Sequence, residues 1–162
     1  MSTTNPNPVG SLTWAVRDSL MRYVTVIAGG SNDIDGPASV DGSGVFTFPL
    51  VGAVSTEDGW RLLFAGSIHF TAHHGLLDIR IIDPEIVVRP ANGTLLARTD
   101  VDSAELTAIV ELGAATPTED GDLLVWDAVP SKLLGSAVDM FGTAYPAGTP
   151  MAPLGIRITI DS

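Results

Sequence analysis

The stretch WRLLFAGSIHF, residues 60–70, decides the fold class because apolar and polar side chains alternate along it. On an extended chain, one face carries the apolar residues Trp60, Leu62, Phe64, Ile68 and Phe70. The opposite face carries Arg61, Ser67 and His69. A period of two residues is typical of a β-strand with one buried face. The stretch therefore predicts a long strand in a sheet that covers a hydrophobic core.

Short runs of β-forming residues, separated by turn residues, continue through the rest of the chain. They predict strands over 45–51, 60–70, 76–82, 85–90, 94–99, 104–112, 122–126 and 155–160. Hairpin-type turn signals occur at Asp58-Gly59, Asn92-Gly93 and Asp120-Gly121. Many short strands at such intervals are typical of an antiparallel β-sandwich or barrel. We therefore expect a mainly β domain of one of these two kinds.

The N-terminal part of the chain has helical spacing instead. Over residues 12–27, apolar side chains and Tyr23 recur on one stripe of a helix. Ser11 precedes this segment as a capping residue, and Gly29-Gly30 follows it as a helix terminator. We expect an N-terminal helix here, with Tyr23 facing the interior. An inward tyrosine on a helix stripe is usually part of the core, with its hydroxyl hydrogen-bonded to a partner, so periodicity alone favours core packing for Tyr23.

A short second helix is expected near 130–141. Pro130 suits a first helical turn, and apolar residues recur on one face of the segment. Residues 31–44, which are rich in Asp, Gly and Ser, are expected to form a loop.

Composition limits the classes of function. The 162 residues suit a single domain, which we place at 11–162 after a flexible segment at 1–10. With 19 acidic against eight basic residues, the net charge of −11 disfavours nucleic acids and anionic membrane surfaces. The chain has no cysteine, so it forms no disulfide or thiolate-bound metal site. No apolar run is long enough to span a membrane, and no signal peptide is recognised at the N-terminus, so the compartment stays open between cytoplasm and export.

Three histidines lie close together in the sequence: His69, His73 and His74. Three imidazoles can bind zinc, although adjacent residues project differently from one backbone. The alternative is that they are ordinary surface or hydrogen-bonded histidines. No nucleophile elbow, phosphate loop or dinucleotide fingerprint is present, so we do not expect an enzyme.

Four sequence blocks, taken in order, resemble the HtaA domain, a family of bacterial haem-binding domains known from haem uptake at the cell surface. The blocks are LTWAVRDSLMRYV at 12–24, FTFPL at 46–50, FAGSIHFTAHHGLLD at 64–78 and FGTAYPAGT at 141–149. The resemblance spans roughly residues 11–160. It implies a mostly β domain with short helices that holds one ferric haem b.

The resemblance also implies roles for individual residues. The family's axial ligand to the haem iron matches Tyr23, and the histidine that hydrogen-bonds this ligand matches His73, with adjacent His74 as its rival. A late tyrosine of the family matches Tyr145. The family commonly has glycine where this chain has Ala72.

This donor set is chemically consistent with ferric haem. Ferric iron is a hard Lewis acid, and tyrosine is a known haem ligand. Free tyrosine has a pKa near 10, so the phenol must be helped to ionise at neutral pH. The bound cation supplies most of that help, and a histidine within hydrogen-bonding reach can supply the rest.

We therefore expect a non-enzymatic haem-binding protein that serves haem uptake, transfer or storage. Other haem-transfer proteins are expected partners, and an exposed porphyrin edge would allow a haem-linked homodimer. The resemblance implies a cell-surface or secreted location. The alternative function is that of a cofactor-free β-sandwich interaction module.

Overall fold

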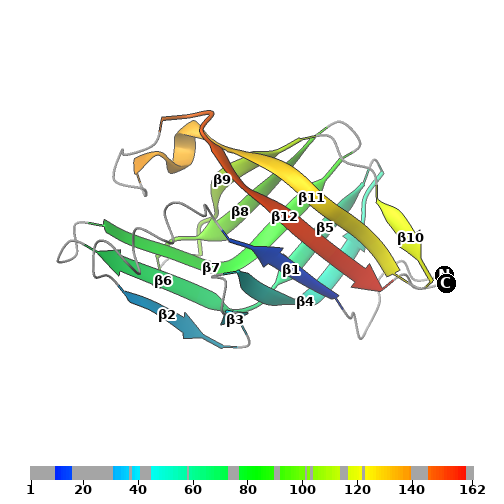
Figure 1. Ribbon diagram of the computed structural model, residues 1–162, viewed down its shortest axis with the longest axis horizontal. Helices are drawn as coiled ribbons and strands as arrows, with labels where there is room; N and C mark the ends of the chain where they lie inside the picture. Colours follow the sequence, from blue (N-terminus) through cyan, green and yellow to red (C-terminus); the bar gives the residue numbers. More distant parts are fainter. Residues whose placement is uncertain are drawn as a thin grey trace.

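The computed structural model (Figure 1) describes residues 10–15, 31–36, 38–40, 45–57, 59–72, 77–89, 92–100, 102, 104–113, 117–121, 123–139 and 146–159. Of residues 31–35, 40, 70–72 and 77–78 it describes the backbone alone. The strands are β1 (Gly10–Trp14), β2 (Ser31–Asp35), β3 (Ser39–Val40), β4 (Phe46–Ser55), β5 (Trp60–Phe64), β6 (Ser67–Ala72), β7 (Leu77–Val88), β8 (Gly93–Arg98), β9 (Thr107–Leu112), β10 (Thr118–Asp120), β11 (Leu123–Leu133) and β12 (Pro150–Thr159). A 3-10 turn, η3 (Gly135–Ala137), follows β11.

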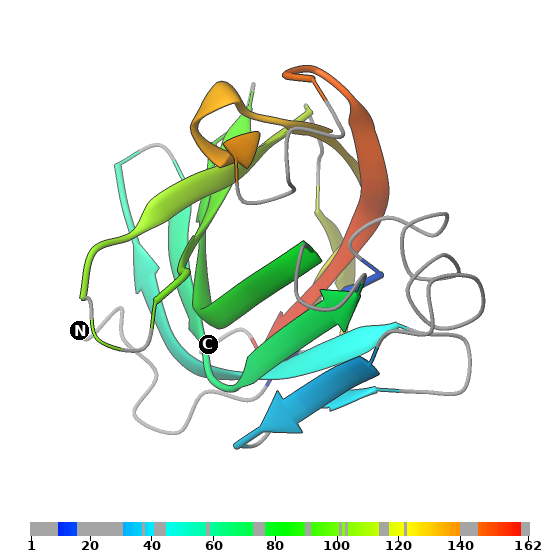
Figure 2. The same cartoon turned by 90° about the vertical axis from the view of Figure 1, so that its left-hand side faces the viewer.

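Eight of the strands close into a ring in the order β7-β5-β4-β1-β12-β11-β9-β8, and β8 pairs back onto β7. Closure depends on β7, which pairs with β5 along one edge and with β8 along the other. Every pairing in the ring is antiparallel. Figure 2 faces one end of this ring. The predicted mainly β antiparallel domain is confirmed, and of the two architectures that the sequence left open it is the barrel.

Additional strands extend the barrel. The first half of β7, residues 77–82, pairs with β6, and β6 pairs with β2 on its other edge. We call this three-stranded unit of β2, β6 and residues 77–82 the arm, and Figure 1 shows it at the left. The short strands β3 and β10 pair with β4 and β11. Among the residues described, no helix is long and apolar enough to cross a lipid bilayer.

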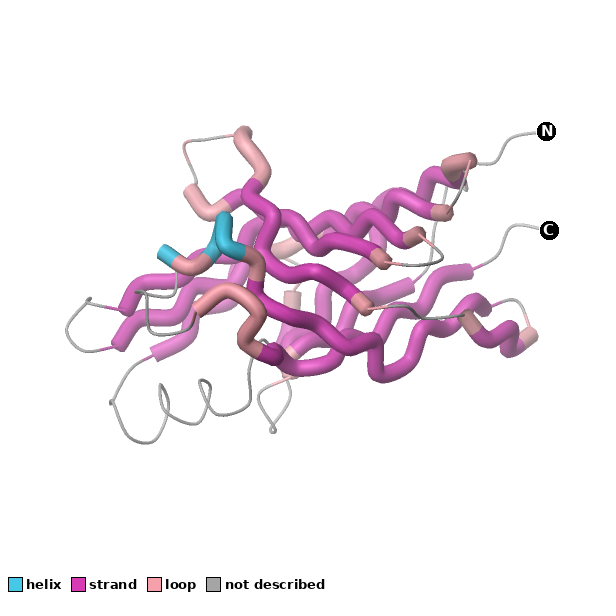
Figure 3. The backbone as a smooth tube through the Cα atoms, turned by 90° about the horizontal axis from the view of Figure 1, so that it is seen from above, coloured by secondary structure: helices cyan, strands magenta, loops and turns pink. Residues whose placement is uncertain are grey.

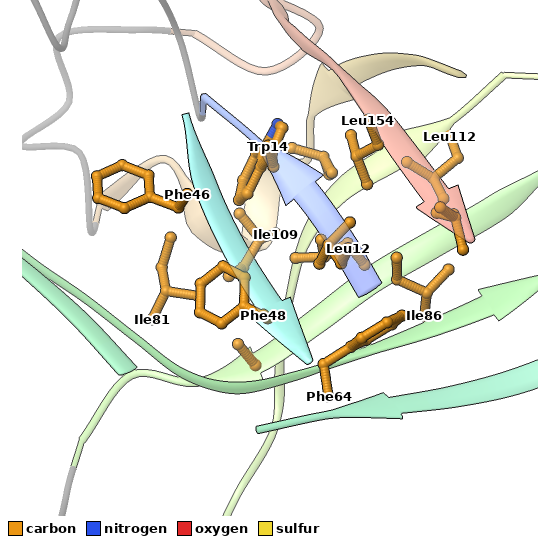
Figure 4. Packing of buried hydrophobic residues seen from close by; sticks show 14 of the residues in the cluster. Leu12, Trp14, Phe46, Phe48, Phe64, Ile81, Ile86, Ile109, Leu112 and Leu154 are labelled. Atoms are coloured by element: carbon orange, nitrogen blue, oxygen red, sulfur yellow. The ribbon is translucent and has the colours of Figure 1, made fainter. Parts of the chain in front are cut away.

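The barrel interior contains one hydrophobic cluster, part of which is drawn in Figure 4. Leu62, Phe64 and Ile68 are all buried in it, as the alternation over 60–70 predicts. Trp60 packs against the cluster while remaining partly exposed. The predicted inward face is thus confirmed for these residues, whereas the side chain of Phe70 is outside the description. The single long strand predicted over 60–70 is wrong, because Ala65 and Gly66, the latter with a φ of 115°, separate β5 from β6.

The predicted N-terminal helix is wrong at its start. Residues 10–14 form β1, which pairs with β12 on one side and β4 on the other. Leu12 and Trp14 are buried, whereas Ser11 and Thr13 are partly exposed, which is the two-residue period of a strand. The remainder of the predicted helix, from residue 16 to 27, lies outside the described residues.

The second predicted helix is also largely wrong. β11 continues to Leu133, with Val129, Ser131 and Leu133 buried in alternation with exposed neighbours. Ser131 breaks the apolar pattern, but its hydroxyl donates a hydrogen bond to the Ala152 carbonyl at 2.8 Å, which satisfies a buried polar group. Among the described residues 130–139, helical geometry is of the 3-10 type and begins only at Gly135.

Other boundaries also differ from the prediction. The strands predicted over 76–82 and 85–90 are one strand, β7, with an irregularity between Ile82 and Glu85. The loop predicted over 31–44 contains β2 and β3 instead. Their sequences are short and polar, so they carry no alternating apolar signal.

Candidate functional site

The four residues that the sequence singles out, Tyr23, His73, His74 and Tyr145, lie outside the residues that the structure describes. Each of them nevertheless lies in a segment that is flanked on both sides by described residues. The structure therefore gives the places at which their segments join the barrel and the arm.

All three segments join either the arm or the end of the barrel from which the arm extends. Residues 16–30 connect the end of β1 to β2, residues 73–76 connect β6 to β7, and residues 140–145 precede β12. The last residue of β1, Trp14, pairs with the first residue of β4, Phe46. This is also the end at which β11 terminates and β12 begins, and it is the end that Figure 2 faces. We call it the arm end.

Two of the segments are joined to adjacent positions in the arm. Ser31, at which the segment 16–30 ends, pairs directly with Thr71 in β6. Thr71 stands two residues before His73. The next residue, Ala72, pairs with Leu77 and has no positive φ, so the strand tolerates alanine where the family commonly has glycine.

The third segment is bounded by residues that are fastened to the barrel. Before it, the Ser136 hydroxyl in η3 donates to the Ala108 carbonyl of β9 at 2.6 Å. After it, the backbone N–H of Leu133 donates to the Thr149 carbonyl at 2.9 Å. Figure 3 shows η3, coloured cyan, at the same end of the molecule as the arm. These contacts place both ends of the segment 140–145 at the arm end.

Beneath the arm end the interior is apolar and tightly buried. Trp14, Phe46, Ile81 and Ile109 each have at most 1% of their surface exposed and come from β1, β4, β7 and β9. Figure 4 shows these four side chains in one cluster. The Trp14 indole N–H is satisfied, because it donates to the Ala152 carbonyl at 3.0 Å. The barrel is therefore filled at this end by a packed apolar layer, which we call the apolar floor.

His69 faces away from this floor. Its neighbour Ile68 is fully buried, and alternation places His69 on the opposite face of β6, across from Arg80 in register. Within the described part of the chain, no group of three or more His, Cys, Asp or Glu gathers as a metal site. His73 and His74 are outside that part, so the zinc interpretation of the three histidines is untested.

A surface hollow of about 310 Å³ lies away from the arm end, on the outer face of β1, β11 and β12. Ser11, Thr13, Asp127 and Arg157 contribute short or exposed polar side chains to it. Its described lining comes from β1, β11 and β12, and we do not assign a ligand to it.

The sequence patterns did not single out Asp83, which is structurally important. Asp83 interrupts β7 with a left-handed backbone, φ 46°, at the boundary between barrel and arm. The available signal was the pair Asp83-Pro84 between two predicted strands, since Pro has no N–H to donate within a sheet.

The fold and the candidate residues thus define a closed eight-stranded antiparallel barrel with an arm at one end, to which three candidate-bearing segments are joined. The sequence model of the HtaA family, described as Htaa, matches residues 9–157. The chain therefore belongs to the HtaA family.

Solved structures have the same fold. The C-terminal domain of HtaA from Corynebacterium glutamicum is 26% identical, covers 98% of this chain and 99% of its own, and superposes with a TM-score of 0.83. The N-terminal domain of the same protein is 25% identical over 95% and 98% of the two chains, with a TM-score of 0.76. The haem-binding protein HtaB from Corynebacterium glutamicum is 21% identical over 99% and 98%, with a TM-score of 0.72. No curated protein sequence matches the chain.

Proposed function

We propose that this protein binds ferric haem b at the arm end, with Tyr23 as the axial ligand and His73 as the hydrogen-bonding partner of that ligand. It serves haem uptake, transfer or storage and has no enzymatic activity. The observation that carries the proposal is that the segments bearing Tyr23, His73 and Tyr145 join the arm or the end of the barrel from which it extends. Membership of the HtaA family and the similarity to HtaB, a haem-binding protein, support haem as the ligand.

The connecting segments are long enough for Tyr23 and His73 to lie close together. Tyr23 stands eight residues after Ala15 and eight before Ser31, so an extended chain could carry it at most about 26–29 Å from either. His73 is covalently limited to roughly 7 Å from Thr71, which is itself the partner of Ser31. The two candidate residues can therefore meet at the arm end without any rearrangement of the barrel.

The residues at the arm end also fit the chemistry of haem. The apolar floor around Trp14 and Phe46 would lie beneath a porphyrin bound at the arm end. A bound haem supplies a ferric iron with an axial position for an oxygen donor. Tyr23 would provide that oxygen, and His73 would accept the phenol proton or donate to the phenolate.

A hemin titration tests the proposed function against its alternatives. Wild-type protein at fixed concentration is titrated with hemin while the visible spectrum is recorded, and the metal content of the purified protein is measured separately. We expect a shifted Soret band that saturates at about one hemin per chain, the stoichiometry of a single haem site. A protein that gives no Soret shift would contradict haem binding and favour the cofactor-free interaction module. Stoichiometric zinc would favour the three-histidine site.

Single substitutions distinguish the roles of the adjacent histidines His73 and His74. We expect His73→Ala to weaken hemin binding by about 10–100-fold, as loss of a partner of a metal ligand typically does. His74→Ala is the matched control and should leave the dissociation constant nearly unchanged. The measurement is the hemin dissociation constant of each variant, from competition with a haem-binding protein of known affinity. The opposite order of effects would make His74 the partner of the ligand.

A haem-linked homodimer is a further part of the proposal. If a porphyrin edge stays exposed at the arm end, two chains can bury their haems against each other. Native mass measurement with and without hemin should then show a dimer only when hemin is bound. A monomer under both conditions would contradict the dimer without affecting haem binding.

A further inference from the structure

The corner between the barrel and the arm is the feature with the most unusual local structure. Residues 77–82 of β7 pair with β6 in the arm, whereas residues 85–88 pair with β5 in the barrel wall. The last residue of β8, Arg98, pairs with Ile82, so β8 accompanies β7 only as far as this point. Asp83 therefore stands where the barrel wall ends and the arm begins.

The backbone of Asp83 has a left-handed conformation, which aspartate adopts less readily than glycine. Its φ of 46° lies in the left-handed region, which costs free energy for a residue other than glycine. The next residue, Pro84, has no N–H to donate to a neighbouring strand. Such a conformation persists only where surrounding contacts fix it.

The contacts that fix it come from the β5–β6 junction and from the end of β8. The Asp83 N–H donates to the Gly66 carbonyl at 2.8 Å, and the Gly66 N–H donates back to Asp83 Oδ1 at 3.0 Å. The Arg98 guanidinium donates from Nη2 to Asp83 Oδ2 at 2.7 Å. The Asp83 carboxylate thus links the β5–β6 junction and the end of β8 to β7. Hydrogen bonds to a charged group are stronger than hydrogen bonds between neutral groups.

The second residue that shapes the corner is Gly66, which lies between β5 and β6 and packs against Ala38. Its φ of 115° favours glycine, and a Cβ atom there would lie 2.5 Å from the Cβ of Ala38 and 2.7 Å from its backbone nitrogen. The connection from β2 to β3 therefore passes directly against Gly66. The corner therefore contacts the end of β8, the β5–β6 junction and the connection between β2 and β3.

We propose that Asp83 is a positioning residue for the ligand site: by holding this corner, it fixes the arm relative to the barrel. Ser31, Thr71 and Leu77, to which two of the candidate segments are joined, all belong to the arm. Asp83 acts through these strands and not by contact with the ligand. The inference rests on the proposed function for the identity of that ligand, and on the structure alone for the role of the corner.

The test compares Asp83→Ala with a matched control. Glu85→Gln removes an ion pair of the same type on the same strand, since Arg61 Nη2 contacts Glu85 Oε1 at 2.6 Å, but on the barrel side of the corner. Amide hydrogen exchange is followed for residues 67–72 and 77–82 of the arm, and for β11 and β12 as an internal reference. Hemin affinity and the visible spectrum at saturating hemin are measured on the same samples.

We expect Asp83→Ala to speed arm exchange and to weaken hemin binding, each by about tenfold, because hydrogen bonds to a charged group are lost. Exchange in β11 and β12 should stay as in wild type. The charge-transfer bands of the bound haem should also change, because the segment that carries His73 is joined to the arm. Glu85→Gln should show none of these effects. Asp83→Asn should be intermediate, since asparagine tolerates the left-handed region and keeps an acceptor for the Gly66 N–H.

Two results would overturn the inference: exchange that rises equally in arm and barrel, or hemin binding that is unchanged in Asp83→Ala. If Asp83→Ala does not fold, Asp83→Asn and Arg98→Gln carry the same comparison. If wild-type protein binds no hemin, the proposed function fails. Selective loss of arm protection in Asp83→Ala would still support the corner as the device that holds the arm.

Discussion

Tyr23→Phe should abolish high-affinity hemin binding. This substitution keeps the aromatic ring and removes only the phenolic oxygen, so packing of the ring is preserved while the axial ligand is lost. Loss of a hydrogen-bonding partner of a metal ligand typically costs 10–100-fold in affinity, so loss of the ligand itself should cost at least about 100-fold. The measurement is a hemin titration followed at the Soret band, with the dissociation constant taken from competition.

Tyr145→Phe is the matched control, because the chain has only two tyrosines. Tyr145 matches a late tyrosine of the family and is joined to the same end of the barrel. It should weaken hemin binding far less than Tyr23→Phe does. A Soret band and dissociation constant that are unchanged in Tyr23→Phe would exclude Tyr23 as the ligand. A larger loss in Tyr145→Phe would transfer the ligand role to Tyr145.

Trp14→Ala should be the most destabilising substitution in the apolar floor. Trp14 has 1% of its surface exposed, belongs to the main hydrophobic cluster and ends β1 between β4 and β12. Truncating a buried tryptophan to alanine removes apolar burial and leaves a cavity, which typically costs about 3–5 kcal/mol of unfolding free energy. Urea unfolding, with the slope m checked for constancy, measures this loss.

Two further variants test whether the loss of unfolding free energy comes from the buried ring of Trp14. Trp14→Phe should cost much less, because the Ala152 carbonyl that accepts from Trp14 at 3.0 Å also accepts from the Ser131 hydroxyl at 2.8 Å. Trp60→Ala should also cost less, since Trp60 is partly exposed and only packs against the cluster. A loss below about 1.5 kcal/mol for Trp14→Ala would contradict its place in the core.

Strands with an apolar face were predictable from the sequence, and strands without one were not. The alternation of Leu62, Phe64 and Ile68 predicts their extended conformation and buried face, although the one strand predicted over 60–70 is two, β5 and β6. In contrast, β1 has two buried positions, Leu12 and Trp14, and Leu12 also fits the helical spacing that continues through residue 27. A five-residue strand is too short to distinguish the two periods when a longer pattern overlaps it.

Other strands were not recognisable from the sequence because polar residues interrupt or replace their apolar pattern. Ser131 occupies a buried position of β11, and its hydrogen bond to Ala152 is a long-range contact that no local pattern reveals. All three residues of β10 are exposed, so this strand has no apolar signal. Closure of the barrel depends on β7 pairing with both β5 and β8, and alternation alone does not distinguish a closed sheet from two packed sheets.

The candidate site was predictable only through the resemblance of sequence blocks. Periodicity predicts that Tyr23 faces inward, and it gives no reason for a ligand over ordinary core packing. What the structure adds is that the segment containing Tyr23 is followed by Ser31, which pairs with Thr71, two residues before His73. The role of the Asp83 corner could not be predicted, because it depends on Gly66 and Arg98, which are distant in sequence.

The central claim is that the Tyr23 phenolate binds ferric haem, and resonance Raman spectroscopy of the hemin complex tests it most directly. Protein labelled with ring-deuterated tyrosine is compared with unlabelled protein, both carrying Tyr145→Phe, so that Tyr23 is the remaining tyrosine. Excitation in the phenolate-to-iron band should show phenolate ring modes that shift on deuteration. A hemin complex of this variant without phenolate modes, or with modes that do not shift, would contradict the claim.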